Sequence, residues 1–166
     1  YLKNYATISY CDYKFIKKFT DKNSKIIEVS TGLGRMMPLF LGYKNYIAYE
    51  PTKKVYELLF CFSKIIKNEN IKIITSLANL NKEKKVDLYY SIDCLGELSN
   101  KVFIEYIDLF KKNLNSNGLI LIRDWWWNKN NLRYLLEIRD LELRKFDINY
   151  FEKHGHNYWY VLRKHV

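Results

Sequence analysis

The sequence predicts an α/β fold: a doubly wound, mostly parallel sheet of seven strands with an antiparallel edge strand. Short apolar runs alternate with longer segments whose apolar residues recur every three or four positions, which is typical of helices packed on a parallel sheet. The run at 86–91 is continuously apolar after Asp87, as expected of a central strand buried on both faces. The last two predicted strands form an antiparallel pair.

The 166 residues suit one domain with a sizeable core, and we predict a single domain over 1–166. It comprises an N-terminal helical segment at 1–22 and a core at 24–165. The predicted strands lie at 25–29, 46–50, 71–75, 86–91, 118–123, 142–150 and 158–163, and the predicted helices at 35–41, 52–67, 100–113 and 130–136.

Local signals set the limits of several elements. Pro38 fits only the first turn of a helix, so the helix before Gly42 is short or starts late. Asn117 and Gly118 predict a turn before the fifth strand. The helix at 52–67 has the strongest helical period and predicts a buried stripe made of Val55, Leu58, Leu59, Phe62, Ile65 and Ile66.

The chain is basic, with a formal net charge of +10. One interpretation is an acidic partner, such as a nucleic acid or a phosphorylated substrate. The other is codon composition, because Lys, Asn, Ile and Tyr are abundant together, as in A/T-rich genomes. The lysines are scattered in pairs rather than gathered in one arm, which favours the compositional interpretation over a nucleic-acid partner.

The three cysteines, Cys11, Cys61 and Cys94, are odd in number and lack metal-ligand spacing. We interpret them as reduced thiols of a cytoplasmic protein, with Cys61 and Cys94 in the core. No run approaches the roughly 20 apolar residues of a membrane span, so no membrane partner is expected.

A loop of small residues follows the first predicted strand, in the pattern Glu28-x-Ser30-x-Gly32-x-Gly34. Glycine lets the backbone approach a ligand with no Cβ in the way. Serine would be strained at the first small position if that position needs a positive φ. A second acid, Glu50, ends the next strand 22 residues after Glu28 and can accept hydrogen bonds from the ribose hydroxyls of an adenosine-type cofactor.

Two cofactor classes use loops of this kind. A dinucleotide fingerprint needs a third glycine where Met37 stands here. The frame E-x-G-x-G-x-G instead resembles the cofactor loop of class I S-adenosylmethionine-dependent methyltransferases, with Ser30 in place of the first glycine. The resemblance covers about residues 24 to 165 and implies a Rossmann-like fold and S-adenosylmethionine as cofactor.

The resemblance also implies roles for individual residues. The loop would line the methionine and ribose side of the cofactor, Glu50 would bind the ribose, and the loop after the third strand would touch adenine. The implied cofactor-binding residues are Glu28, Ser30, Thr31, Gly32, Gly34, Glu50, Pro51, Ser76, Leu77, Asp93 and Cys94. For Glu50 a solvated strand end, and for Asp93 a helix N-cap, are the alternative interpretations.

A hydroxyl acceptor would need a base, and three side chains are candidates: Asp124, which ends the fifth strand, His154 and Glu97. The alternatives are a surface hairpin loop for His154 and a carboxylate at a helix start for Glu97. His154 and His156 lack a third ligand nearby, so no metal site is predicted. Trp125 to Trp127 are candidates for the wall of an acceptor site.

The acceptor class follows from the segment after the fourth strand. Methyltransferases of nucleic-base amino groups carry an N/D-P-P-Y/F run there, and this chain has Ser91-Ile92-Asp93-Cys94. The segment through Leu98 is loosely similar to bacterial sugar O-methyltransferases, so a small-molecule or sugar hydroxyl is the leading acceptor. Two alternatives stay open: a non-catalytic subunit that binds S-adenosylmethionine or a partner, and an RNA-directed methyltransferase or RNA-binding module.

Overall fold

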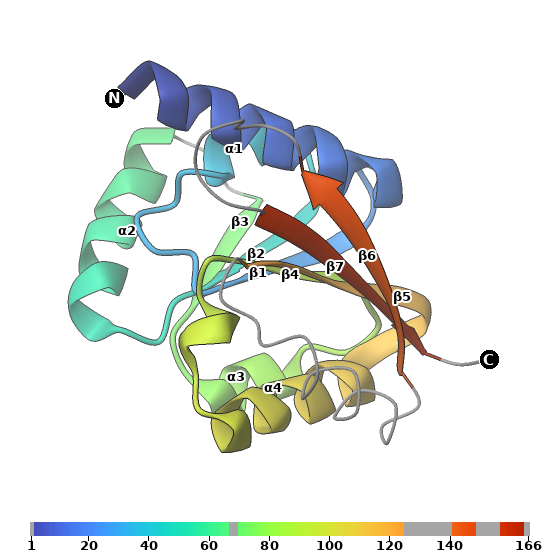
Figure 1. Ribbon diagram of the computed structural model, residues 1–166. Coiled ribbons are helices and arrows are strands. Elements are labelled where there is room, and N and C mark those ends of the chain that lie inside the picture. The colour runs from blue at the N-terminus through green and yellow to red at the C-terminus, as the bar shows by residue number, and fades with distance from the viewer. Residues whose placement is uncertain (1, 67–69, 125–140, 149–156, 165–166) are drawn as a thin grey trace. The chain divides into compact units, whose positions relative to one another are not determined.

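The computed structural model of the chain describes residues 2–66, 70–124, 141–148 and 157–164 (Figure 1). The predicted helix at 130–136, the three tryptophans and the loop with His154 and His156 lie outside these residues. The elements are α1 Leu2–Ile16, η1 Lys17–Phe19, β1 Lys25–Val29, η2 Met37–Phe40, β2 Asn45–Tyr49, α2 Lys53–Ile66, β3 Ile71–Ile74, α3 Leu77–Lys82, β4 Val86–Ile92, η3 Leu95–Glu97, α4 Asn100–Asn113, β5 Leu114–Asp124, β6 Leu141–Ile148 and β7 Asn157–Lys164.

The predicted fold class is confirmed. The described strands form one mixed sheet of seven, in the order β3-β2-β1-β4-β5-β7-β6. The pairs β1–β2, β2–β3 and β4–β5 are parallel, and β7 is antiparallel to both β5 and β6. Among the described helices, none has the length and apolar character needed to cross a membrane.

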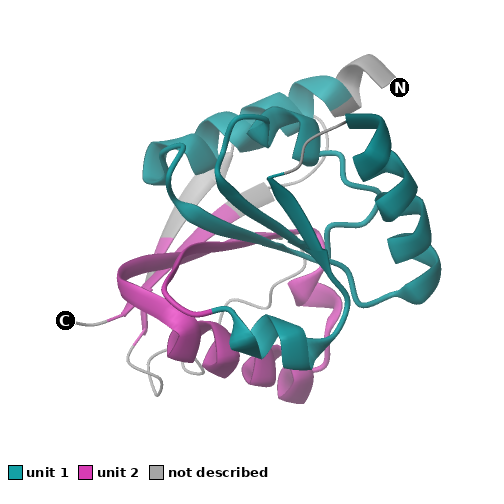
Figure 2. Ribbon diagram, turned by 180° about the vertical axis from the view of Figure 1, so that it is seen from behind, with its two compact units in different colours: residues 1–83 teal, residues 84–166 magenta. Residues whose placement is uncertain are grey.

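The chain divides into two compact units, residues 1–83 and residues 84–166, with the boundary between α3 and β4 (Figure 2). Unit 1 holds α1, α2, α3 and the parallel strands β1 to β3. Unit 2 holds α4 and the strands β4 to β7. The prediction of a single domain over 1–166 stays a prediction, and each unit is described by itself.

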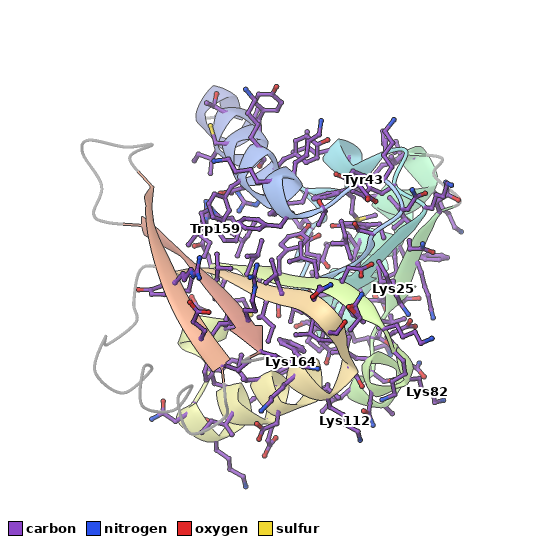
Figure 3. The ribbon with its side chains drawn as sticks, turned by 90° about the vertical axis from the view of Figure 1, so that its right-hand side faces the viewer. Lys25, Tyr43, Lys82, Lys112, Trp159 and Lys164 are labelled. Atoms are coloured by element: carbon purple, nitrogen blue, oxygen red, sulfur yellow. The ribbon has the colours of Figure 1, made fainter. Side chains whose placement is uncertain are left out.

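Aromatic side chains build the core of unit 1. Tyr46 of β2 is fully buried and stacks on Phe40 of η2, with ring centroids 4.9 Å apart. Phe40 also meets Tyr13 of α1 edge-on at 5.2 Å and Tyr43 at 5.0 Å; Tyr43 is labelled in Figure 3. Offset and edge-to-face pairs add to the free energy of burial, so these rings are what hold α1 and η2 on the strands.

The face that α2 buries is narrower than the sequence predicted. Leu59 is fully buried, but Leu58 is 60% and Ile65 74% exposed, so the prediction of a buried stripe is wrong for these two residues. The other predicted residues of the stripe are half-buried: Val55, Phe62 and Ile66. Successive helical residues are turned by about 100°. Leu58 precedes Leu59 by one residue and Ile65 follows it by six, so both are turned by about 100–120° away from a contact line centred on Leu59.

The cysteines also differ from the prediction. All three are free thiols, but Cys61 is exposed and Cys94 is partly exposed, so neither belongs to the core. Cys61 lies two positions after Leu59 on α2, which turns it by about 200° away from the buried side. Cys94 lies in the loop between β4 and η3.

In unit 2, α4 packs on the sheet through a close ring contact: Phe110 stacks on Tyr89 of β4 at 4.3 Å. The turn predicted at Asn117 and Gly118 is wrong, because β5 runs through both residues. A Cβ at Gly118 would lie 2.8 Å from the carbonyl oxygen of Val86 and 2.7 Å from Leu114. Gly118 thus allows close approach of two strands at a register irregularity between Val86 and Leu88.

A buried carboxylate ties together the strands of unit 1. Glu83, at the end of α3, pairs with Lys25 of β1 at 2.8 Å and with Lys72 of β3; Lys25 is labelled in Figure 3. Burial alone would raise the pKa of Glu83, but the hydrogen bonds and charges of the two lysines outweigh it and lower that pKa from its ordinary value.

We predict that Glu83 contributes stability at neutral pH that is lost in acid. Because its folded pKa is lowered, this stability is present above the unfolded pKa of about 4.3 and disappears as the pH falls through the folded value. Glu83→Gln should lower the free energy of unfolding at pH 7 by about 1–3 kcal/mol and flatten its acid dependence. Urea titrations from pH 7 to acid measure both effects. Glu57→Gln, at an exposed position of α2, is the control, and an equal loss in both variants would contradict the prediction.

Candidate functional site

The loop between β1 and η2 is built from left-handed backbone conformations at alternate positions. The φ angles are +59° at Ser30, +58° at Gly32 and +78° at Gly34. The N–H groups of Ser30 and Thr31 both donate to the carbonyl oxygen of Tyr49, at 2.9 and 3.2 Å. These hydrogen bonds fasten the loop to the end of β2. Ser30 has the positive φ at which a serine was expected to be strained.

Thr31 closes the base of this loop. Its side chain is buried, and its hydroxyl lies 3.4 Å from the carbonyl oxygens of both Glu28 and Tyr49. The next turn follows at once, because the N–H of Gly34 donates to the carbonyl oxygen of Thr31 at 3.1 Å. Thr31 thus stabilises the conformation of the loop through hydrogen bonds to the backbone.

The two glycines have different roles. A Cβ at Gly34 would lie 2.6 Å from Leu59 Cδ1 and 2.7 Å from Met37 Sδ, so this glycine gives room to the protein's own side chains. A Cβ at Gly32 would meet nothing within 4 Å. The open space above Gly32 is where a ligand can approach bare backbone.

Glu50 joins the loop to two further segments. Its carboxylate accepts hydrogen bonds from the N–H groups of Gly32 and Thr52, each at 2.9 Å. Its own N–H donates to the carbonyl oxygen of Ile74, at the end of β3, at 3.0 Å. The residue is 4% exposed, so it is not a solvated strand end. A carboxylate offers about four acceptor positions, which leaves capacity for ribose hydroxyls.

The carboxyl ends of β1, β2 and β3 lie at one edge of unit 1, because these strands are parallel. That edge carries the loop, then Glu50 with the exposed Pro51, then Ser76 and Leu77. Ser76 caps α3 by accepting from the N–H of Asn79 at 3.2 Å. Leu77 is 45% exposed and offers an apolar surface. Ligand sites of open α/β sheets occur at such an edge.

Glu28 has a partner inside unit 1. It is 4% exposed, and its carboxylate accepts a hydrogen bond from the hydroxyl of Tyr46. Because Tyr46 is itself fully buried under Phe40, this pair orders the core beneath the loop. The role of Glu28 as a cofactor ligand stays a prediction.

Asp93 is neither in regular structure nor a helix cap. Its φ is +53°, its N–H donates to the carbonyl oxygen of Arg123 at 2.9 Å, and its carboxylate pairs with the guanidinium of Arg123. The N-cap of α4 is Ser99, and that of η3 is Cys94. Asp93 therefore acts as the counterion of Arg123, whose side chain is 6% exposed.

The candidate bases lie on different segments of the chain. Glu97 is exposed at the end of η3, where its N–H donates to the carbonyl oxygen of Cys94 at 3.0 Å. Asp124 ends β5, in register with Tyr158 of β7. His154 lies outside the described residues. Their roles in catalysis stay predictions.

Sequence reasoning missed two cationic residues next to the candidate positions. Arg123 precedes Asp124 and pairs with Asp93. Arg35 follows Gly34, and its guanidinium lies 3.6 Å from Asp12, a fully buried carboxylate of α1. The only sequence signal for the second pair was a single acid within an aromatic helix, and nothing in the sequence connects it to the loop.

Comparison with known proteins supports the fold. No protein-family model matches the sequence, and no curated protein matches it. Among solved structures, an S-adenosylmethionine-dependent methyltransferase from Clostridium acetobutylicum has a TM-score of 0.76 at 12% identity, covering 99% of this chain and 92% of that one. An rRNA methylase from Streptococcus thermophilus has a TM-score of 0.71 at 14% identity, covering 93% and 94%.

A third structure is precorrin-6y C5,15-methyltransferase from Geobacter metallireducens, with a TM-score of 0.67 at 15% identity, covering 86% of this chain and 81% of that one. The fold is therefore the Rossmann-like fold of class I S-adenosylmethionine-dependent methyltransferases. The similarity to sugar O-methyltransferases has no support among these structures. Since they include an rRNA methylase and a precorrin methyltransferase, the fold leaves the acceptor undetermined.

We predict that Ser30→Gly stabilises the protein. A non-glycine residue in the left-handed conformation costs about 1–2 kcal/mol, which glycine would remove. The greater freedom of glycine in the unfolded chain offsets about 0.4–1 kcal/mol of that gain. The net gain should be about 0.5–1 kcal/mol in the free energy of unfolding, measured in urea. Ser30→Ala keeps the strain and serves as the control; a gain from alanine equal to that from glycine would contradict the account.

The two glycines predict unequal losses. Gly34→Ala adds a methyl group against Leu59 and Met37 to the backbone strain, and should lower the free energy of unfolding by about 2–4 kcal/mol. Gly32→Ala meets no atom and should lower it only by the strain of about 1–2 kcal/mol. Paired urea titrations compare them, and equal losses would show that the contacts of Gly34 carry no weight.

Proposed function

We propose that this chain is an S-adenosylmethionine-dependent methyltransferase that acts on a small-molecule or sugar hydroxyl. One observation carries the proposal: the buried carboxylate of Glu50 binds the N–H of Gly32, at a loop whose outer side is open at that glycine. Bare backbone facing a carboxylate at the end of the second strand is the chemistry that an adenosine-type ligand requires.

Each part of the edge of unit 1 has a role in this proposal. Glu50 accepts from the ribose hydroxyls with its remaining lone pairs. The backbone of Ser30, Thr31, Gly32 and Gly34 lies under the ribose and methionine, and Pro51 flanks Glu50. Ser76 and Leu77 border the adenine, for which the exposed side chain of Leu77 offers an apolar contact.

The methionine end carries an ammonium and a sulfonium charge, which carboxylates complement. Glu28, Asp93 and the adjoining Cys94 are the candidates by resemblance. Asp93 is 42% exposed at its side chain while pairing with Arg123, so part of its carboxylate faces solvent. The buried guanidinium would hold this carboxylate in place.

The reaction needs little covalent help from the protein. The cofactor, when bound, supplies an activated methyl group on a sulfonium. The protein aligns the acceptor oxygen with the methyl group. The acceptor then loses its translational and rotational freedom on binding and not in the reaction step, which lowers the activation free energy by several kcal/mol. A base takes the hydroxyl proton, which contributes a factor of roughly 10² to 10⁴. Asp124, Glu97 and His154 are the candidates for this base.

The acceptor class rests on sequence. Ser91-Ile92-Asp93-Cys94 lacks the N/D-P-P-Y/F run of methyltransferases that act on amino groups of nucleic bases. The backbone of Asp93 in this segment has the left-handed conformation. A hydroxyl acceptor fits a site with carboxylate and imidazole candidates for a base.

The proposal predicts that the chain binds S-adenosylhomocysteine and that Glu50 contributes to the affinity. Glu50→Gln removes charge-assisted hydrogen bonds worth about 1.5–3 kcal/mol, so affinity should fall by about 10- to 100-fold. Calorimetric titration measures both proteins, with circular dichroism to show that the variant is folded.

Glu57→Gln, which removes an exposed carboxylate of α2 with the same change of charge, should leave this affinity unchanged. Absence of binding by the native chain would refute the proposed function. Unchanged affinity of a folded Glu50→Gln variant would remove Glu50 from the site.

A further inference from the structure

The helix α1 presents one face to solvent from residue 6 onward. Thr7, Tyr10, Lys14 and Lys17 are exposed and follow each other at helical spacing, and Lys18 is exposed beside them. The opposite side holds the buried residues Ser9, Asp12, Phe15 and Ile16. We call Tyr10, Lys14, Lys17 and Lys18 the basic face of α1 and η1; α1 is the blue helix labelled in Figure 1.

Within α1 and η1, no exposed acid balances this face. Asp12 is the only acid between residues 2 and 20, and it is fully buried beside Arg35. The same holds more widely in unit 1, where 14 Lys and Arg accompany 7 Asp and Glu. Four of those acids, Asp12, Glu28, Glu50 and Glu83, are buried. The surface of unit 1 is therefore more basic than its composition indicates.

Aromatic rings organise the lysines. Lys14 Nζ lies 5.0 Å from the ring centroid of Tyr10, Lys17 Nζ 5.9 Å from that of Tyr13, and Lys18 Nζ 5.7 Å from that of Phe15. Lys14, Lys17 and Lys18 are spaced at i, i+3 and i+4, where like charges repel and destabilise a helix. A bound anion with repeated charges would relieve that repulsion.

We propose that the basic face of α1 and η1 binds single-stranded nucleic acid. The three exposed ammonium groups carry the charge that complements phosphates, and Tyr10, which is 49% exposed, offers a ring on which a base can stack. A membrane surface fits less well: none of the exposed residues between 6 and 18 is a large aliphatic one, and an interfacial helix needs an apolar face.

This inference goes beyond the proposed function, because binding on α1 needs no cofactor. If the proposed function also holds, RNA is a candidate acceptor, because it is a polyanion that carries sugar hydroxyls. Binding and methyl transfer can therefore fail separately in experiment.

The test is fluorescence anisotropy with a labelled uridine oligoribonucleotide of about 12 nucleotides, across about 50 to 200 mM salt. A thymidine oligonucleotide of the same length distinguishes RNA from DNA. The native chain should bind, with affinity falling steeply as salt rises. The triple variant Lys14→Gln, Lys17→Gln, Lys18→Gln should bind at least tenfold more weakly and lose about 2 from the log–log salt slope, at about 0.7 for each phosphate contact.

The matched control is the triple variant Lys53→Gln, Lys54→Gln, Lys64→Gln on α2. It removes three exposed lysines of the same unit, one of them above Phe60 at 4.5 Å, and changes the net charge equally. It should bind like the native chain. Tyr10→Ala should weaken binding about tenfold without changing the salt slope, and Tyr10→Phe should restore it.

Three results would overturn the inference. Equal weakening by both triple variants would show an effect of net charge alone. Binding without salt dependence would exclude phosphate contacts. Stronger binding to vesicles containing phosphatidylserine than to either oligonucleotide would assign the face to a lipid surface. Titration of the α1 variant with S-adenosylhomocysteine reports the proposed function separately and should match the native chain.

Discussion

The carboxylate of Glu50 is the point on which the candidate site depends. It is buried, so its charge has to be matched by hydrogen bonds, and the N–H groups of Gly32 and Thr52 supply them. The same contacts fix the loop after β1 and the start of α2 relative to the end of β2. Left-handed residues persist where the surroundings over-determine them, and Ser30 is such a case. The loop is therefore shaped before any ligand arrives, which lowers the entropy cost of binding.

The two glycines of the loop have different surroundings. Gly34 and Gly32 occupy equivalent positions in the motif, yet the first faces Leu59 and Met37 and the second faces open space. One glycine serves the packing of α2 against the loop, and the other serves access to the backbone. Within three residues, the motif thus joins a requirement of packing to the open backbone that the proposed ligand would need.

The sequence predicted the elements whose signals are local. The strand at 25–29 and the helix at 100–113 agree to the residue, because a polar turn or a cap such as Ser99 marks where they start. Tertiary contacts decided the rest: β5 passes through Gly118 because β4 comes close there, and α2 buries a line narrower than its apolar period. The loop and Glu50 were visible as a motif. The pairing of Arg123 with Asp93 joins residues 30 positions apart, and no periodicity reveals it.

The acids in the interior of unit 1 bear on how its charge can change in evolution. Glu50 and Glu83 are held by named donors, so replacing either would leave N–H or ammonium groups without their acceptor. Exposed lysines that hold no buried acid are not constrained in this way, and mutational bias can add or remove them at little cost. The buried acids are therefore constrained by the contacts they make, whereas the number of exposed lysines can also reflect the codon composition of the genome. A lysine-rich exterior is informative where its side chains lie on aromatic rings, as three of them do along α1 and η1.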